Sequence, residues 1–301
     1  MWAFKTLYDK NLLYEGYRVL PYSWACETPV SNFETRLDDS YRERQDPAVT
    51  VRFTLEERIE GKLVDILAWT TTPWTLPSNL ALAVGPDIEY GIYELGDRLV
   101  VIGKACIEKY AKELDSAQLV GTRSGSELVG APYEPLFDFF QGRENCHRIL
   151  SADWIDTEEG TGIVHMAPGF GEDDMNTCSD AKIEVVCPVD DHGRFTGEVP
   201  NWEGLQVFEA NTPIIRSLRQ EKRIFREESY VHNYPHCWRT DTPLIYRAVN
   251  SWYVRVTQFR DRMAELNQEI NWIPGHVKDG LFGNWLSNAR DWSISRNRIW
   301  G

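Results

Sequence analysis

Apolar and polar positions alternate over many short stretches of the chain, which predicts strands separated by turns. Residues 49–53 (VTVRF) alternate as a half-buried strand does, and residues 62–70 (KLVDILAWT) form a longer apolar run. Residues 81–103 contain three more such stretches, divided by a Gly-Pro and a Gly-Asp turn. Residues 147–155 and 183–190 have the same character. The pattern predicts a mainly β protein with a closed or strongly curved sheet, and not a doubly wound one.

Helical spacing of apolar residues occurs in a few places between these stretches. At the N-terminus it puts Trp2, Leu7 and Leu12 or Leu13 near one face. The fold class we expect is therefore α+β, with most residues in strands. Helices are expected over residues 1–20, 104–114, 171–181 and 209–224.

Length and composition are those of a globular protein. The chain has 301 residues, 42% of them hydrophobic, and no window approaches the roughly 20 apolar residues of a membrane helix. Its first 20 residues lack the charged and apolar regions of a secretory signal. The six cysteines form no CxxC pair and no disulfide framework, which favours a reducing, cytoplasmic location. The abrupt start predicts that the chain is part of a longer protein.

The formal net charge of −14 argues against a general nucleic-acid binder, because such proteins are usually basic. Any contact with RNA must then be local. The best local candidate is the basic run of Arg290, Arg296 and Arg298. The alternative is that these arginines are solvated charges around a Trp-rich segment.

Residues 160–174 (GTGIVHMAPGFGEDD) carry the first candidate chemistry. Two apolar residues precede His165, and glycines and a proline then break regular structure before three acidic residues. The stretch predicts a short buried strand that ends in a tight turn and delivers His165 and Asp174 into one space. In the alternative interpretation, the turn leads from strand to helix, and Glu172 and Asp173 merely favour a helix N-terminus.

Residues 70–79 (TTTPWTLPSN) are the second stretch with candidate chemistry. Three threonines fit an extended segment with hydroxyls on both faces, and Pro73 and Pro77 forbid its continuation as a central strand or a helix interior. Trp74 between the prolines would be a rigid apolar wall in a loop. The alternative is a strand end with a Ser/Thr turn and a tryptophan that belongs to the core.

Taken together, the two stretches resemble the editing domain of isoleucyl-tRNA synthetases, the large insertion that splits the class I catalytic core. The leucyl and valyl enzymes carry an arginine-containing threonine motif at the first stretch, whereas this chain has Thr72-Pro73-Trp74. The resemblance continues through residues 234–256 and 288–301, so it covers nearly the whole chain.

This resemblance implies a fold and a division of the chain. We expect a curved β-barrel editing domain, of the type found in the Val, Leu and Ile enzymes, over residues 43–231. Two connector arms would carry it: residues 1–42 with the N-terminal helix, and residues 232–301, which rejoin the class I core. There Trp292 would pack on the rest of the synthetase.

The resemblance also implies an activity, the hydrolysis of valine misattached to tRNA(Ile). By the family pattern Asp174 matches the anchor for the amino group, His165 the pocket histidine, and the threonine run the catalytic lining. The chemistry of the side chains adds Trp74 as a steric wall and Asn79 as an amide that can donate and accept. No general base is assigned, because positioning and the hydroxyls of the RNA can suffice. The expected catalytic residues are Thr70, Thr71, Thr72, His165 and Asp174, with substrate contacts from Trp74, Asn79, His165 and Asp174.

One departure from many bacterial relatives concerns a structural zinc ion held by two CxxC pairs. The matching segments here are residues 23–26 (SWAC) and 237–240 (CWRT), so two of four thiolates remain. Structural zinc needs four Cys or His ligands, and His236 directly adjoins Cys237, which is awkward for chelation. His232 is the other available histidine. We predict no metal, and the pattern is similar to that of the eukaryotic-type branch of the family.

No HIGH or KMSKS element and no Gly-rich phosphate loop occurs. We therefore expect no cofactor in this chain, although the whole synthetase would use ATP and Mg²⁺. The expected partners are the 3′ end of tRNA(Ile), the misattached valine and the rest of the synthetase core, with no membrane. Two alternatives remain: a non-catalytic module that binds the tRNA end or the amino acid, and an unrelated His/Asp hydrolase with a chance match.

Overall fold

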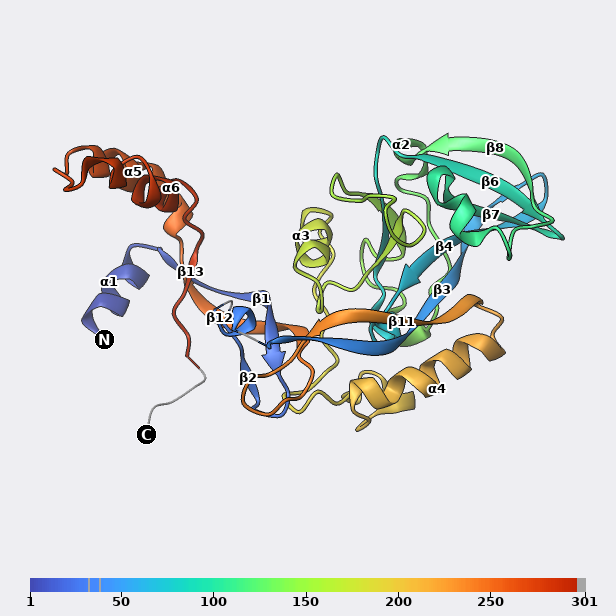
Figure 1. Cartoon of the computed structure of the whole chain (residues 1–301), viewed down its shortest axis with the longest axis horizontal. Coiled ribbons are helices and arrows are strands. Elements are labelled where there is room, and N and C mark those ends of the chain that lie inside the picture. The colour runs from blue at the N-terminus through green and yellow to red at the C-terminus, as the bar shows by residue number, and fades with distance from the viewer. Residues whose placement is uncertain (32, 38, 297–301) are drawn as a thin grey trace. The chain divides into compact units, whose positions relative to one another are not determined.

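The computed structural model describes residues 1–31, 33–37 and 39–296 (Figure 1). The chain divides into two compact units, one of Met1–Arg18 with Val249–Gly301 and one of Val19–Ala248. The boundaries between these units differ from those of the three parts inferred from the sequence, and that three-part division stays a prediction. All candidate site residues lie in the second unit.

A six-stranded sheet is the largest sheet of the second unit (Figure 1). Its order is β11 (Ile224–Pro235), β3 (Tyr41–Ile59), β4 (Lys62–Thr70), β7 (Arg98–Gly103), β6 (Glu89–Leu95) and β8 (Gln118–Ser124). Strands β4 and β7 run parallel, and every other neighbouring pair is antiparallel. The sheet is a half-barrel, and the expected α+β class with mostly strands is confirmed.

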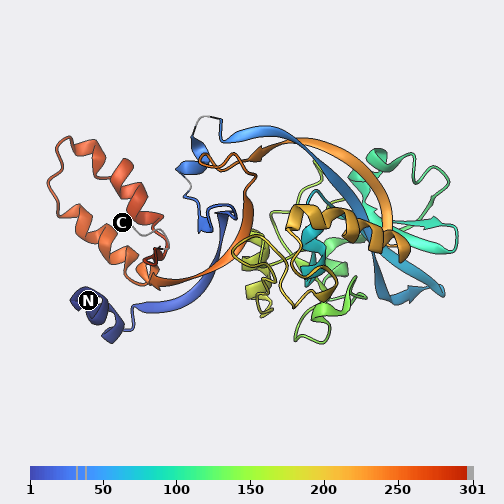
Figure 2. The ribbon, with the colours of Figure 1, turned by 90° about the horizontal axis from the view of Figure 1, so that it is seen from below.

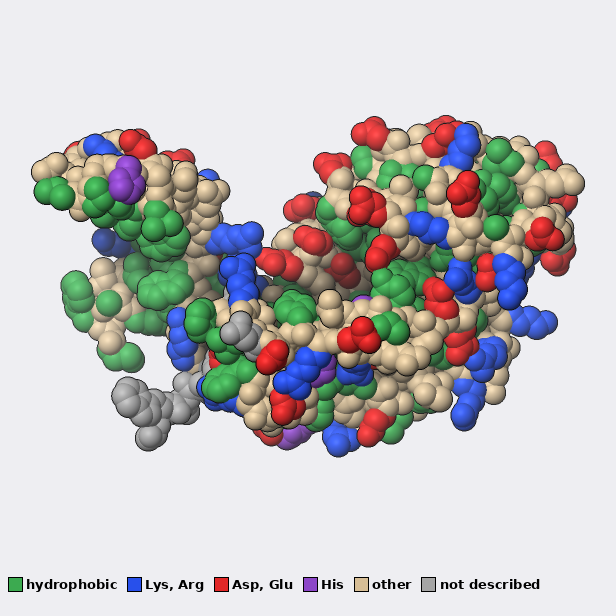
Figure 3. All heavy atoms as spheres, viewed as in Figure 1, with side chains coloured by type: hydrophobic (Ala, Val, Ile, Leu, Met, Phe, Trp, Pro, Cys, Tyr) green, Lys and Arg blue, Asp and Glu red, His purple; other side chains and the backbone are tan. Residues whose placement is uncertain are grey.

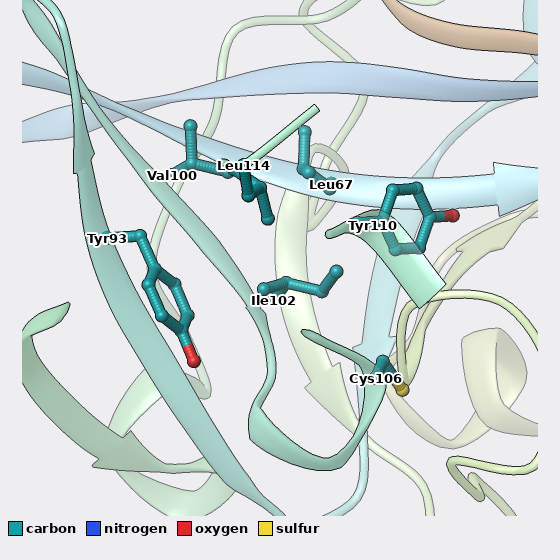
Figure 4. Close-up of a cluster of buried hydrophobic side chains, with 7 residues drawn as sticks. All are labelled: Leu67, Tyr93, Val100, Ile102, Cys106, Tyr110 and Leu114. Atoms are coloured by element: carbon teal, nitrogen blue, oxygen red, sulfur yellow. The ribbon is translucent and has the colours of Figure 1, made fainter. Parts of the chain in front are cut away.

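The apolar run of residues 62–70 forms β4, at the predicted bounds. Its Leu67 packs in a buried cluster with Val100 and Ile102 of β7 and with Tyr110, which comes from the segment after that strand (Figure 4). Each of these four side chains is at most 2% exposed. Burial of such side chains stabilises the fold by about 1.5–3 kcal/mol each, so the cluster helps to hold β4 against β7.

A smaller sheet of three strands carries the site. It has the order β10 (Ile163–Met166), β5 (Ala81–Val84) and β9 (Arg148–Ser151), with β5 antiparallel to β10 and parallel to β9. All four residues of β5 are buried. This strand begins two residues after Asn79, so one buried strand joins the two candidate motifs.

The remaining strands form a four-stranded sheet, and one of its strands corrects a prediction. The sheet has the order β13 (Trp292–Ser293), β12 (Ile245–Val254), β1 (Leu13–Ser23) and β2 (Thr28–Pro29). The N-terminal helix ends at Asp9, where a helix to about residue 20 was expected. Asn11 takes the left-handed conformation with φ 56°, which ends the helix, and the chain then pairs in the sheet as β1. Sheet pairing thus overrides the helical spacing.

Residues 183–190 are not a strand, which is a second correction. Ile183 and Val186 are buried, but the segment forms no ladder, and its one β-bridge joins Val189 to Phe195. The apolar residues of this segment are therefore buried without being part of a sheet. The helix expected over residues 104–114 is a 3₁₀-helix over Lys104–Tyr110.

The other expected helices are confirmed. Helix α4 lies along β11, and in the first unit α5 and α6 lie side by side (Figures 1 and 2). No helix in the described part of the chain is long and apolar enough to cross a membrane. The α-helices are α1 (Trp2–Asp9), α2 (Gly125–Leu128), α3 (Glu172–Asp180), α4 (Val207–Gln220), α5 (Arg260–Gln268) and α6 (Leu281–Ser287). Short 3₁₀-helices cover Glu34–Arg36, Pro73–Ser78, Lys104–Tyr110, Asp138–Phe140, Pro200–Trp202, Val256–Gln258 and Gly275–Val277.

Candidate functional site

The two candidate motifs contact each other in the second unit. Strand β10 pairs with β5 so that His165 lies opposite Leu82. The ring Nε2 of His165 lies 2.8 Å from Thr75 Oγ1, and its Nδ1 lies 3.1 Å from Asn79 Nδ2. Segments 90 residues apart in the sequence therefore share one set of hydrogen bonds.

The threonine triplet begins at the end of β4. Thr70 is the last residue of β4, and the Oγ1 of Thr70 accepts the backbone N–H of Thr72 at 3.1 Å. This is the Ser/Thr turn that the alternative interpretation proposed, so the turn and the clustered hydroxyls occur together. Thr71 and Thr72 are half-buried, and the Thr70 and Thr72 hydroxyls lie 3.1 Å apart. The turn therefore gathers short hydroxyls at one place.

Trp74 is the second residue of the 3₁₀-helix Pro73–Ser78. Its side chain is 2% exposed and packs edge-on against Phe170 with 4.8 Å between the ring centroids. Asn211 of α4 accepts its backbone N–H at 2.9 Å. Trp74 is thus a rigid core residue that bridges the threonine segment and the turn after β10.

His165 is buried, with 7% of its surface exposed. Burial lowers its pKa from 6.5 to about 4, because the charged ring would lose its hydration. The imidazole is therefore neutral at physiological pH. Since both ring nitrogens have hydrogen-bond partners within the protein, a role as general base has no support here.

Asp174 lies in the first turn of α3. Its Oδ2 accepts the N–H of Ala167 at 2.8 Å, which ties the carboxyl group to the end of β10. Burial raises the pKa of Asp174 from 3.8 to about 6, and the nearby Asp173 adds to this effect. A Cβ on Gly171 would lie 2.6 Å from Asp174 Cγ, so only glycine leaves room for the carboxyl group.

The alternative for this motif also holds in part, because Glu172 and Asp173 are exposed in the same helix turn. Such acids favour a helix N-terminus. Asp174 differs from them because it is half-buried, which marks it as the unusual carboxylate of the three.

In the structure His165 contacts Asn79 directly and Thr72 through Thr75. Asp174 is bonded to the residue after β10. The roles of these residues stay predictions. Sequence reasoning missed Thr75, which lies inside the quoted motif three residues after Thr72. It also missed Tyr133, whose hydroxyl donates to Asn79 Oδ1 at 2.6 Å. Tyr133 lies in a loop-rich stretch with no signal that could have pointed to it.

The cysteines of the expected connector arms lie outside this site. Cys26 packs against a buried cluster that contains Cys237. Burial raises the pKa of the Cys237 thiol, but hydrogen bonds with Ser23, Thr240 and nearby backbone outweigh it and bring the pKa to about 7. Over residues 1–31, 33–37 and 39–296, no three His, Cys, Asp or Glu side chains are grouped to hold a metal ion. The absence of zinc stays a prediction.

The basic run at the C-terminus is described only in part. Arg296 donates to the carbonyls of Ser293 and Ser295, and Arg298 lies outside the described residues. Trp292 beside it is 60% exposed. Over the visible face of the molecule acidic side chains are widely spread, in keeping with the net charge of −14 (Figure 3).

Comparison with known proteins gives one family match over residues 1–301, to the tRNA synthetases class I (I, L, M and V). The chain is 60% identical over 311 residues to an isoleucine–tRNA ligase of Rickettsia peacockii, and 60% identical over 306 residues to one of Rickettsia canadensis. Each alignment covers 100% of this chain, which spans 28% of the length of these relatives. These matches confirm the resemblance drawn from the two motifs. The finer assignment to a eukaryotic-type branch stays a prediction.

Two solved structures have a similar arrangement of elements. The crystal structure of GlLeuRS-CP1 has a TM-score of 0.47 and 14% identity, and covers 59% of this chain and 97% of that one. The editing domain of the P. falciparum cytosolic leucyl-tRNA synthetase has a TM-score of 0.46 and 10% identity, and the match covers 60% of this chain and 99% of that one.

Proposed function

Because the chain belongs to the class I tRNA synthetases of the I, L, M and V type, we propose that it is the editing module of an isoleucine–tRNA ligase. In this proposal it hydrolyses valine that has been attached wrongly to tRNA(Ile). The observation that carries the proposal is the contact between the threonine segment and the His165 segment, with the half-buried carboxyl group of Asp174 fixed to the end of the same strand.

The need for such a module follows from the size of a methylene group. Isoleucine and valine differ by one methylene, and an apolar pocket separates them by only about 1–3 kcal/mol; isoleucyl-tRNA synthetase is itself the usual example of this limit. A second pocket that admits valine and excludes isoleucine removes the error after it has been made. That pocket needs a rigid wall, an anchor for the ammonium group and polar groups around the ester.

The side chains of the site meet these needs. Asp174 anchors the ammonium group, since a half-buried carboxylate forms a strong charge-assisted hydrogen bond. Trp74, held against Phe170, keeps the wall rigid. The hydroxyls of the half-buried Thr71 and Thr72 orient the attacking water or the terminal ribose. Catalysis in this scheme comes from positioning and electrostatics, and no residue acts as general base.

The activity of the longer enzyme belongs to the same proposal. That enzyme charges tRNA(Ile) with isoleucine in the cytoplasm for protein synthesis, and its ATP and Mg²⁺ bind in the catalytic core and not in this chain. The partners of this chain are then the 3′ end of tRNA(Ile) and the rest of the synthetase.

Replacement of Asp174 by alanine tests the proposal. We expect the chain to release valine from Val-tRNA(Ile), and the variant to do so about 10- to 100-fold more slowly, since a hydrogen bond to a charged group contributes about 1.5–3 kcal/mol. Asp173→Ala, an exposed acid in the same helix turn, is the matched control and should deacylate as the wild type does.

Equal rates for the wild type and Asp174→Ala would contradict the role given to Asp174. If the wild-type chain binds Val-tRNA(Ile) but releases no valine, the alternative of a non-catalytic binding module replaces the proposal. If it neither binds nor hydrolyses the mischarged tRNA, the motif match has no functional meaning in this chain.

A further inference from the structure

A chain of buried hydrogen bonds runs from Tyr133 to the threonine segment through Asn79 and His165. The Tyr133 hydroxyl donates to Asn79 Oδ1 at 2.6 Å, and Asn79 Nδ2 lies 3.1 Å from His165 Nδ1. On the other side of the ring, His165 Nε2 lies 2.8 Å from Thr75 Oγ1. The Thr75 hydroxyl in turn donates to the Thr72 carbonyl at 2.8 Å. Tyr133, Asn79 and His165 are 1%, 5% and 7% exposed, so water does not replace these bonds.

The orientation of the Asn79 amide follows from its fixed neighbours. Its Nδ2 donates to the backbone carbonyl of Ala81 at 2.8 Å, and a carbonyl can only accept. The opposite orientation would place two acceptor oxygens against each other there. Burial raises the pKa of Tyr133 well above its usual 10, so its hydroxyl keeps the proton that it donates to Asn79 Oδ1. The second N–H of the amide therefore points to His165.

This orientation determines which nitrogen of His165 carries the proton. Nδ1 faces an N–H of Asn79, so it must be the acceptor of the ring. A neutral imidazole has one acceptor and one donor nitrogen, so the proton lies on Nε2. Nε2–H then donates to Thr75 Oγ1, and the Thr75 hydroxyl has its own acceptor in the Thr72 carbonyl. In this series of hydrogen bonds each N–H or O–H has one acceptor, and every bond points from Tyr133 toward the Thr72 carbonyl.

We propose that Tyr133 is a positioning residue of the editing site, which together with the Ala81 carbonyl orients Asn79 and so holds His165 as the neutral Nε2–H form bound to the threonine loop. This role rests on the proposed function, because the loop that it fixes carries the hydroxyls given to the substrate. His165 in this arrangement takes no part in proton transfer. Through hydrogen bonds it links Tyr133 and Asn79 on one side to Thr75 and the Thr72 carbonyl on the other.

The wild-type chain alone provides the first test. A long-range ¹H–¹⁵N spectrum of the 301-residue chain at neutral pH reports the proton position for each of its six histidines, with His165→Gln used for assignment. We expect His165 to show an unprotonated Nδ1 and a protonated Nε2. A proton on Nδ1, or a charged ring at neutral pH, would overturn the inference.

The second test compares Tyr133→Phe with Tyr110→Phe. Tyr110 is also buried, and its hydroxyl bonds to Thr50 away from this network, so it controls for the loss of a buried hydroxyl. We expect Tyr133→Phe alone to add a minor Nδ1–H form of His165, because only the Ala81 carbonyl then orients Asn79, and to give a kcat for Val-tRNA(Ile) deacylation about five- to tenfold lower, with KM little changed. The same spectrum and the same rate in the two variants would contradict the role of Tyr133.

Asn79→Asp keeps the inference testable if Tyr133→Phe does not fold. A carboxylate can only accept, so it should move the proton of His165 to Nδ1 and reverse the ring signals. Unchanged signals would overturn the inference. A wild-type chain that has the expected Nε2–H form and yet releases no valine would instead refute the proposed function, and would leave Tyr133 as the residue that fixes the ring.

Discussion

The half-buried carboxyl group of Asp174 gives a prediction about stability and pH. Burial raises its pKa from 3.8 to about 6, so the folded protein holds the ionised group less well than water does. One pKa unit corresponds to about 1.4 kcal/mol, which makes the cost of an ionised Asp174 at neutral pH about 3 kcal/mol. An asparagine side chain at this position would have the same shape and no charge, and its Oδ1 could still accept the N–H of Ala167.

Asp174→Asn should therefore stabilise the second unit in a way that depends on pH. Because the folded pKa lies above the unfolded one, the folded state binds the proton more tightly, and stability falls as pH rises from about 4 to 6. Asp174→Asn has no carboxyl group to ionise, so its stability does not fall in this way. Its gain over the wild type should approach about 3 kcal/mol at pH 8, less any cost of an unpaired amide N–H, and should vanish near pH 4.

His165 contributes an opposite slope over much of the same range. Its folded pKa of about 4 lies below the usual 6.5, so the unfolded chain takes up the proton first and stability falls as pH drops below 6.5. In the wild type the two effects oppose each other between about pH 4 and 6. In Asp174→Asn only the His165 effect remains, so the variant should lose stability on acidification where the wild type changes little.

The assay is urea unfolding at pH 4, 6 and 8, followed by hydrogen-exchange mass spectrometry of peptides from β10 and α3. This readout reports the second unit itself, which matters because the chain has two compact units. The matched control is Asp173→Asn, whose carboxyl group is exposed. A variant at Asp174 that is no more stable than the wild type at pH 8, or equally changed at pH 4 and 8, would refute the reasoning. Loss of binding of a valyl ester by the same variant would show that the unfavourable charge serves the ligand.

Three further changes test other parts of the structure. Thr72→Arg should lower the ratio of valyl to isoleucyl ester hydrolysis about tenfold, because a long side chain fills the space for valine; an unchanged ratio means that Thr72 does not line the pocket. Asp65→Ala should reduce the free energy of unfolding by about 3–5 kcal/mol in urea titrations, since Asp65 is fully buried between two arginines; a loss below about 1 kcal/mol contradicts this. Gly169→Ala should cost about 2 kcal/mol or more, because its Cβ would lie 2.1 Å from the Val186 carbonyl oxygen, whereas Gly121→Ala has room and should unfold as the wild type does.

The sequence predicts the buried strands of the half-barrel well. Residues 62–70 combine an apolar run with β-branched residues, and β4 has those bounds. The amphipathic spacing of residues 209–224 likewise locates α4. In these segments the local pattern and the tertiary surroundings favour the same structure.

Elsewhere tertiary contacts decide. Residues 13–20 have helical spacing and become part of β1, because a distant strand offers backbone partners that the local sequence cannot reveal. The same limit applies to the site. Asn79 and His165 could be chosen from their motifs, but Tyr133 comes from a loop whose sequence has no period, and only the fold brings its hydroxyl to Asn79.

The four residues of β5 also bear on which changes of chain length the protein can tolerate. Side chains alternate between the two faces of a strand, so a slip of β5 against β10 by one position would put Val164 or Met166 where His165 now lies opposite Leu82. A single inserted or deleted residue between Asn79 and Ala81 would force such a slip. The turn at Gly96 joins β6 to β7 as a hairpin and lies in open space, so an added residue there can loop out without shifting the pairing of the two strands. Natural variation in length should therefore gather at that turn and spare the short link before β5.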